Sequence, residues 1–311
     1  MSPRASILII TYNQEDLVRE TVESCLAQTF ADYEIVVSDD GSKDNTQSIL
    51  LDLQAQHPDR IKLVLNAENK GITANCNAGL RACSGDFVAL MGGDDLLLPE
   101  KIGAQVAAFD ADDELVFSYH PCFVLRDGNM DEIVGDLAKD VVTNQIEMIS
   151  NFGAQMPGPA TMVRASAIPE VGFREEIGTA SDWMFFIDVA AHGSVRRIDT
   201  PLAVYRQHGG NVGQRYFAYT ADFLDTLAIA RAEYGDHAGV KKAVKRGGRR
   251  FLLGGVYRSI EQGRPQQARQ YANYLRNFGD GWLVPALHFA SYVPGAGGLL
   301  RGLKRTLKRY V

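Results

Sequence analysis

The chain has 311 residues, 46% hydrophobic and 23% charged, so it can bury a core and does not resemble a disordered protein. At roughly 100–200 residues per domain this length predicts about two domains, and the formal net charge of −6 argues against binding to nucleic acid. The charge is unevenly divided. Residues 1–239 hold 17 Lys and Arg against 36 Asp and Glu, whereas residues 240–311 hold 15 against 2. The acidic body and the basic end therefore need separate explanations.

Several protein classes are excluded by missing patterns. The four cysteines, Cys25, Cys76, Cys83 and Cys122, are too few and scattered for a disulfide scaffold, and no CxxC pair indicates a zinc site. The first residues run straight into a strand-like stretch without the layout of a secretory signal, so we expect reduced thiols and a cytoplasmic location. No apolar run reaches the roughly 18–20 residues of a transmembrane helix. No Walker A, GxGxxG, HExxH or GxSxG motif occurs.

The first hundred residues alternate between two hydrophobic periods. Residues 6–11 (SILIIT) form a short β-branched run typical of a buried strand, and residues 15–28 then place apolar side chains at helical spacing. The alternation continues with strands at 33–38, 61–65 and 87–91 and helices at 43–56 and 72–82. Strands and helices that alternate with short connections predict an α/β fold, with a parallel sheet covered on both faces.

The pattern changes after Pro99. We expect helices at 101–109 and 182–191, strands at 114–125, 160–164, 195–198 and 203–206, and a polar, loop-rich stretch at 127–144. From residue 216 onward the sequence reads as helices, at 216–234, 240–262 and 265–278, and Pro265 suits the first turn of the last one. We therefore place a domain boundary near residue 215.

Polar clusters follow the predicted strands of the first hundred residues. They are Thr11-Tyr12-Asn13, Ser38-Asp39-Asp40-Gly41-Ser42, the set Asn66, Asn69, Lys70 and Gly71, and Gly92-Gly93-Asp94-Asp95. Ligands of open α/β sheets bind at the carboxyl ends of the strands, so these side chains are expected to meet in one crevice. Carboxylates gathered there suit Mg²⁺ or Mn²⁺ that bridges phosphates. Either acidic cluster alone is equally well explained as a turn or helix cap, but two of them at strand ends favour a site.

The strings SILIITYNQEDLVRETVESCLAQTF, YEIVVSDDGSKDNT and NKGITANCNAGLRACSGDFVALMGGDD resemble, in this order, the nucleotide-binding half of family 2 glycosyltransferases. The resemblance extends from Ser6 to about Lys101. It implies the GT-A fold, a mixed, mostly parallel sheet flanked by helices, here with a helical C-terminal appendage. Residues 1–215 would be the catalytic domain, with a nucleotide-binding half (1–100) and an acceptor half (101–215), and residues 216–311 a basic helical region.

The resemblance also assigns roles to the strand-end residues. Thr11 and Tyr12 would line the base pocket, Asp40 would accept a hydrogen bond from a base such as uracil, and Asp39 would support that loop. Asn13 and Asn69 belong to the same nucleotide-sugar set. Asp95 would bind the metal, and Asp94 the metal or the ribose. The chain departs from many family members, which have Asp where it has Gly92, so the division of roles between Asp94 and Asp95 stays open.

Weaker signals continue the resemblance in the second half. Thr179–Phe186 resembles the acidic segment that supplies the catalytic base, with Asp182 as the matching residue. Ser181 is expected to cap that helix, whose dipole would favour the ionised carboxylate; the alternative is an ordinary carboxylate at a helix start. Tyr205–Asn211 resembles a late segment in which Arg206 would offset pyrophosphate charge and His208 would touch the metal or diphosphate. Gly158–Thr161 would border the acceptor pocket.

The basic end has its own pattern. Residues 298–311 (GLLRGLKRTLKRYV) combine apolar residues at helical spacing with five Lys and Arg, the layout of an interfacial helix on anionic lipid. Trp282, Phe289 and Tyr292, just upstream, would sit at headgroup depth. The alternatives are a helix packed on the acidic body and a dimer contact. We expect a cytoplasmic protein on the inner face of the membrane, with no nucleic-acid partner, and the sequence leaves a homo-oligomer open.

The sequence therefore predicts a metal-dependent, inverting glycosyltransferase. It would move a sugar from a nucleotide-diphosphate sugar, such as a UDP-sugar, to an acceptor hydroxyl, with Mn²⁺ or Mg²⁺ as cofactor. The acceptor would be a cell-surface or lipid-linked glycan. Two alternatives are a nucleotidyltransferase, whose usual Gly-rich basic loop is absent after the first strand, and a non-catalytic nucleotide-sugar-binding module of a polysaccharide-assembly complex.

Overall fold

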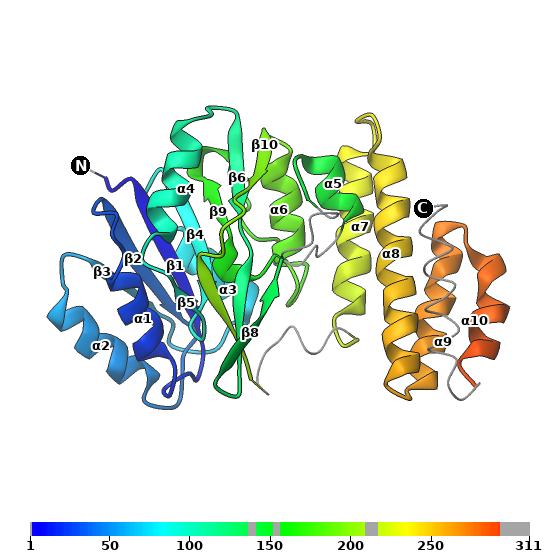
Figure 1. Ribbon diagram of the computed structural model, residues 1–311, viewed down its shortest axis with the longest axis horizontal. Helices are drawn as coiled ribbons and strands as arrows, with labels where there is room; N and C mark the ends of the chain where they lie inside the picture. Colours follow the sequence, from blue (N-terminus) through cyan, green and yellow to red (C-terminus); the bar gives the residue numbers. More distant parts are fainter. Residues whose placement is uncertain (1, 136–140, 152–155, 209–216, 293–311) are drawn as a thin grey trace. The chain divides into compact units, whose positions relative to one another are not determined.

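The computed structural model describes residues 2–135, 141–151, 156–208 and 217–292 (Figure 1). The chain forms two compact units. The first contains residues 1–148 and 153–215, and the second contains residues 149–152 and 216–311. The catalytic role of the first unit, and its division into a nucleotide-binding half and an acceptor half, stay predictions.

A seven-stranded sheet forms the centre of the first unit, in the order β10-β6-β9-β4-β1-β2-β3. Its strands are β1 (Ala5–Thr11), β2 (Tyr33–Asp39), β3 (Ile61–Leu65), β4 (Phe87–Gly92), β6 (Leu115–Tyr119), β9 (Met162–Arg164) and β10 (Ser194–Arg197). Within this sheet only β9 runs antiparallel to its neighbours, β4 and β6. The predicted mixed, mostly parallel sheet is therefore confirmed.

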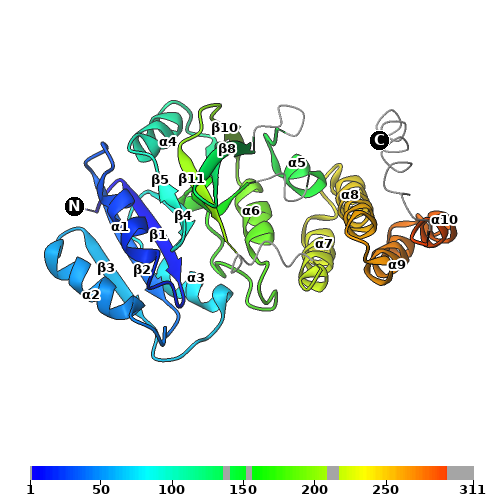
Figure 2. The same cartoon turned by 60° about the horizontal axis from the view of Figure 1, so that its bottom comes forward.

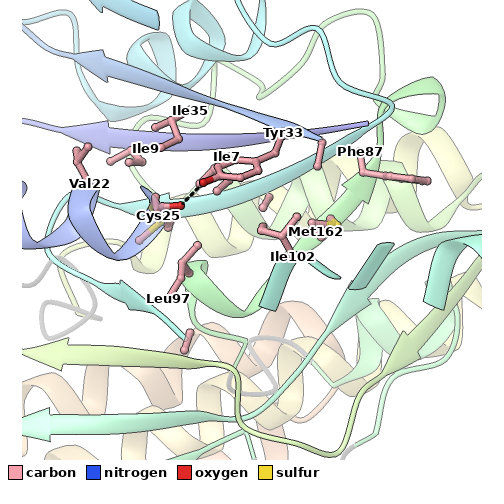
Figure 3. Packing of buried hydrophobic residues seen from close by; sticks show 14 of the residues in the cluster. Ile7, Ile9, Val22, Cys25, Tyr33, Ile35, Phe87, Leu97, Ile102 and Met162 are labelled. Atoms are coloured by element: carbon pink, nitrogen blue, oxygen red, sulfur yellow. Dashed lines mark hydrogen bonds between the residues drawn. The ribbon is translucent and has the colours of Figure 1, made fainter. Parts of the chain in front are cut away.

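Helices cover both faces of this sheet (Figure 2). On one face α1 (Val18–Leu26), α2 (Thr46–Gln56) and α4 (Lys101–Asp110) bury the core that contains Ile7 and Ile9. In that core the Tyr33 hydroxyl donates to the carbonyl of Cys25 at 3.0 Å (Figure 3). On the other face lie α3 (Ile72–Leu80) and α6 (Asp182–Ala190). Neighbouring side chains of a strand point to opposite faces, so the continuous apolar run of β1 supplies apolar side chains to both layers.

A smaller sheet corrects two sequence expectations. It contains β5 (Leu96–Leu97), β11 (Ala203–Gln207), β7 (Cys122–Arg126) and β8 (Asn129–Val134), in the order β5-β11-β7-β8. The single strand expected at 114–125 is wrong, because β6 and β7 lie in different sheets, separated by Pro121, which has no N–H to continue a ladder. The expected loop at 127–144 begins instead with a hairpin. Asp127 and Gly128, both with positive φ, form its turn.

The second unit is helical. It contains α7 (Thr220–Tyr234), α8 (Val240–Glu261), α9 (Pro265–Tyr274) and α10 (Val284–Ala290); the helix α5 (Gln145–Ser150) spans the change from the first unit to this one. Phe251 of α8 packs edge-on against Phe223 and Tyr271, with ring centroids 4.8 and 5.9 Å apart. Gly255 lets Tyr271 approach, since a Cβ there would lie 2.6 Å from its ring. The helices expected at 240–262 and 265–278 are confirmed, the second with a 3₁₀ last turn, whereas α10 was not predicted. Within the described residues, no helix meets the length and hydropathy needed to span a membrane.

Candidate active site

The loops after β1 and β2 brace each other at the carboxyl edge of the large sheet. The backbone N–H of Asn13 donates to the Ser42 hydroxyl at 2.8 Å, and the Asn13 side-chain oxygen accepts from the N–H of Lys43, also at 2.8 Å. Asn13 has a φ of 52°, a left-handed conformation that Asn tolerates better than most residues. The N–H of Gln14 donates to Thr46 at 2.8 Å. Asn13 therefore holds the loop together as well as lying at the predicted site.

Asp39 and Asp40 use their carboxylates to build this edge. Asp39 is buried and accepts from the Ser42 N–H at 3.0 Å and the Gln47 amide at 2.6 Å. The two oxygens of Asp40 accept from successive backbone N–H groups after β3, Lys70 at 2.9 Å and Gly71 at 3.0 Å. Each carboxylate oxygen has a second lone pair, so Asp40 retains acceptor capacity for a ligand.

The other predicted nucleotide residues differ in exposure. Thr11 is buried and donates to the Gln14 side-chain oxygen at 2.8 Å, so its hydroxyl is engaged within the loop. Tyr12 is 43% exposed, and the exposed Asn69 accepts from the N–H of Gly71 at 3.1 Å. Tyr12, Asn13 and Asn69 are thus the exposed members of this set that present surface to a ligand.

The Asp94-Asp95 pair lies at the end of β4, against the end of β11. Asp94 Oδ2 is 2.8 Å from Nε2 of His208, and Asp95 Oδ1 accepts from the backbone N–H of Arg206 at 3.0 Å. Burial, and then the nearby Asp94 carboxylate, raise the pKa of Asp95 well above its usual range. The Arg206 guanidinium donates to Glu20 of α1 at 2.7 Å. The structure therefore brings together the three predicted metal residues. The contact between Arg206 and Glu20 could not be predicted from the sequence.

This cluster fits a divalent cation only as part of a larger ligand set. The described residues contain no group of three His, Cys, Asp or Glu side chains arranged to hold a metal by themselves. Asp94 and His208 do converge, and Mg²⁺ is commonly held by one or two carboxylates while substrate phosphates and water complete its shell. The donor set therefore fits a cation that arrives with a diphosphate.

Asp182, the predicted base, begins α6. Its side chain reaches solvent but is surrounded by enough protein that loss of water raises the pKa of this carboxyl group. Its Oδ1 accepts from the N–H of Trp183 at 2.8 Å. Two expectations are corrected here. The Ser181 hydroxyl makes no cap hydrogen bond and lies 2.9 Å from the Thr73 hydroxyl instead. Burial raises the pKa of Asp182, whereas the helix start was expected to favour its ionised form.

Helix α3 holds the segment that precedes Asp182, which the sequence reasoning missed. The buried Asn77 grips Phe173 from both sides: its oxygen accepts the Phe173 N–H and its amide donates to the Phe173 carbonyl, both at 2.8 Å. One turn earlier, the buried Thr73 hydroxyl contacts the carbonyls of Ile177 and Gly178. Polar residues at i and i+4 on a helix share a face. Their i, i+4 spacing was the available signal in the sequence, but it does not show that this face of α3 is buried.

Helix α4 similarly fixes the segment expected to border the acceptor. Lys101 is fully buried and donates to the Thr161 carbonyl at 3.3 Å, and Gln105 donates to the Ala160 carbonyl at 3.1 Å. Burial lowers the pKa of Lys101 to about 7. A Cβ on Gly158 would lie 3.9 Å from the Cα of Met91, so this segment lies beside the C-terminal end of β4.

Hydrogen bonds link most of the predicted residues into one edge. The N–H of Asp40 donates to the Thr11 carbonyl at 3.0 Å, and Asp40 holds Gly71, the residue before α3. Helix α3 then contacts Ser181 through Thr73. Asp40 and Asp182 both act on the Cys76 thiol of α3, whose pKa burial raises to about 12. The N–H of Gly93, next to the predicted metal pair, donates to the carbonyl of Ile10 at 2.9 Å. The base, metal and nucleotide residues predicted from the sequence thus lie around the carboxyl ends of the neighbouring parallel strands β1, β2 and β4.

Comparisons with known proteins identify the relatives of this chain. The profile of Glycosyl transferase family 2 matches residues 6–132. An uncharacterized glycosyltransferase of Nostoc sp. is 30% identical over 219 residues, which cover 67% of this chain and 66% of that protein. The chain spans 64% or less of the length of several other curated relatives.

Two solved structures show the fold. A Staphylococcus aureus TarS structure with UDP-GlcNAc has a TM-score of 0.68 at 15% identity, covering 94% of this chain and 89% of that one. A mannosyltransferase of Pyrobaculum calidifontis, with GDP-Man and Mn²⁺, has a TM-score of 0.63 at 20% identity, covering 99% and 81%. The fold is therefore GT-A, and the chain belongs to glycosyl transferase family 2.

Proposed function

We propose that this chain transfers a sugar from a nucleotide-diphosphate sugar to an acceptor hydroxyl, with inversion at the anomeric carbon. One observation carries the proposal. The loop edge around Asp40, the Asp94–His208 pair and Asp182, a carboxylate with a raised pKa, lie around the carboxyl ends of neighbouring strands of one sheet. Family membership favours sugar transfer over nucleotidyl transfer.

Donor binding is assigned to the edge formed after β1, β2 and β3. Tyr12 and Asn69 present surface there, and Asp40 has lone pairs left to accept an N–H from the base. Uracil offers such an imide N–H, so UDP-sugars are the first donors to test. The two solved neighbours hold UDP-GlcNAc and GDP-Man, so guanine nucleotides belong in the same experiment.

A divalent cation would be held by Asp94 and His208, with Asp95 beside them and the donor's phosphates completing the shell. Mn²⁺ or Mg²⁺ at this place supplies positive charge that stabilises the departing nucleoside diphosphate. The protein's own part is to keep the two carboxylates close together, which the Arg206 N–H does by fixing Asp95.

Asp182 is assigned the role of general base. The acceptor oxygen attacks the anomeric carbon, its proton passes to the Asp182 carboxylate, and the bond from that carbon to the phosphate oxygen breaks. The bonding electrons leave with the nucleoside diphosphate. A carboxylate whose pKa is raised by desolvation is a stronger base than an ordinary aspartate, which suits this step.

The acceptor is proposed to be a cell-surface or lipid-linked glycan, with the protein on the cytoplasmic face of a membrane. The excess of Lys and Arg in residues 240–311 supports this assignment. The predicted amphipathic segment 298–311 lies outside the described residues.

The test is calorimetric binding of UDP-, GDP- and ADP-sugars, each with Mn²⁺ and each with a chelator. We expect one nucleotide class to bind, and its affinity to fall on chelation. Affinity no higher than that of the free nucleoside, or no response to the chelator, would contradict the metal-bridged donor. Turnover by the wild type but not by Asp182→Asn, with donor binding kept, supports catalysis. Binding without turnover for any acceptor would favour a non-catalytic module.

A further inference from the structure

The exposed side of residues 281–292 is apolar. Trp282, Phe289 and Tyr292 are 71%, 73% and 69% exposed, and the residues exposed between them are Pro285 and Ala286. Pro285, Ala286 and Phe289 lie on α10 at i, i+1 and i+4, while Trp282 lies in the 3₁₀ turn before this helix and Tyr292 just after it. Their spacing in the chain, i, i+3, i+4, i+7 and i+10, is that of one helical face. We call these five residues the aromatic face.

The exposed side of this segment is apolar, whereas the exposed side of an ordinary surface helix is charged or polar. The stretch 281–292 contains no Asp, Glu, Lys or Arg, and its buried side is anchored by Val284, which is 1% exposed. A surface helix of a globular protein normally turns charged residues to the solvent. Large aromatic residues exposed together on one face indicate that something covers them.

Cations flank the aromatic face at both ends. The Arg269 guanidinium lies 4.6 Å from the centre of the Tyr292 ring. At the Trp282 end, the exposed Arg276 packs on Gly281, where a Cβ would lie 3.3 Å from its side chain. The exposed Lys245 approaches Gly279 in the same way. Residues 240–292 carry ten Lys and Arg against two acidic residues, Glu261 and Asp280.

We propose that the aromatic face docks on an anionic lipid bilayer. Trp and Tyr rings favour the headgroup region, and neighbouring Lys and Arg attract anionic lipid. Charge argues against a second copy of this chain as the occupant, because self-association through this face would bring Arg269, Arg276 and Lys245 of both copies together. The element lies on the membrane and does not cross it, in keeping with its short length.

This surface is separate from the residues assigned to donor binding and catalysis, so its test does not depend on turnover. A membrane contact here would hold the protein where a lipid-linked acceptor resides. Binding to vesicles and transfer of sugar are measured in different assays, so either proposal can fail while the other stands.

The first experiment is flotation of the full chain with vesicles of phosphatidylcholine and phosphatidylglycerol in equal parts, and with phosphatidylcholine alone. We expect the wild type to float with the anionic vesicles and the double variant Trp282→Ser/Phe289→Ser to float several-fold less. Leu51→Ser, at a 50% exposed apolar position of the first unit, is the matched control and should float like the wild type. Equal flotation of the double variant and the wild type would overturn the proposal.

Tryptophan fluorescence emission measures the contact between the aromatic face and lipid directly. The chain has two tryptophans, and Trp183 is buried at 3% exposure, so a change on lipid addition reports Trp282. A blue shift in the wild type that is missing in Trp282→Phe supports insertion of this ring. Flotation without any shift would assign binding to other residues and overturn the proposal. A vesicle-independent dimer that the double variant abolishes, seen by light scattering, would identify a self-association face instead.

Discussion

Two regions of the candidate site are held in place in different ways. Several short hydrogen bonds join the loops after β1 and β2, such as those of Asn13, Gln14 and Asn45, so the loss of one bond leaves the others in place. The segment that delivers Asp182 depends mainly on two side chains of α3, Thr73 and Asn77. We therefore expect the first region to tolerate the loss of one side chain. In the second region, a few hydrogen bonds determine where Asp182 lies.

We expect the largest effect on activity at Asp182, at the end of the segment that Thr73 and Asn77 hold. Asp182→Asn removes the proposed base, so kcat should fall about 10²–10⁴-fold, the usual contribution of such catalysis. The Asn oxygen can still accept the N–H of Trp183, so the fold should be kept. A steady-state assay with a thermal melt of the same sample checks both. Unchanged kcat would remove Asp182 from the mechanism.

The pH profile sharpens the same assignment. Desolvation raises the pKa of Asp182, so the carboxylate is protonated at a higher pH than an ordinary aspartate. Turnover should be full above this raised pKa and fall about tenfold per pH unit below it. Because the pKa is higher in the folded chain than in the unfolded one, the group stabilises the fold at acid pH and loses that contribution as pH rises. Asp182→Asn should therefore not lower the melting temperature at neutral pH.

Asn77→Ala tests the positioning directly. It leaves the buried N–H and carbonyl of Phe173 without their amide partner, which should cost about 1–3 kcal/mol in the free energy of unfolding. It should also lower kcat more than it raises the KM of the donor, because the carboxylate is displaced while the nucleotide edge is intact. Urea unfolding and steady-state kinetics give the two values.

Thr73→Val, which keeps the shape and removes the hydroxyl, should show the same pattern with a smaller loss. The matched control is Thr226→Val, a buried threonine of α7 whose hydroxyl bonds within its own helix. Kinetic constants that respond equally to Thr73→Val and Thr226→Val would show that α3 has no special role.

The smallest effect is expected in the braced loops. Asn45→Ala removes one bond to Glu15, but the Asn45 backbone N–H continues to donate to the same carboxylate at 2.9 Å. The free energy of unfolding should change by no more than about 0.5 kcal/mol. Kinetic constants should stay at wild-type values. A loss as large as that of Asn77→Ala would break the comparison between the two regions.

The sequence was sufficient for the first hundred residues because their apolar runs carry clear periods. SILIIT and YEIVVSD are buried strands, and the acidic residues after them do border the edge that was predicted. Hydrophobic periodicity reads only apolar positions, however, so it could not show that Thr73 and Asn77 turn inward on α3.

The remaining gaps have other physical causes. Arg206 and Glu20 are 186 residues apart, and no local pattern pairs them. The break between β6 and β7 did have a signal, the proline at 121, as did the hairpin turn at Asp127-Gly128. The raised pKa of Asp182 depends on how much protein surrounds the carboxyl group, and the spacing of residues along the chain does not predict this.

The missing side chain at Gly92 leaves room for the orientation that the Asp94 carboxylate adopts in this chain. A Cβ at residue 92 would lie 2.5 Å from Oδ1 of Asp94, so any side chain there would force that carboxylate to rotate. Rotation would take Oδ2 away from His208, its neighbour at 2.8 Å. An aspartate restored at position 92 would therefore replace the pairing with His208 rather than add a third carboxylate to it.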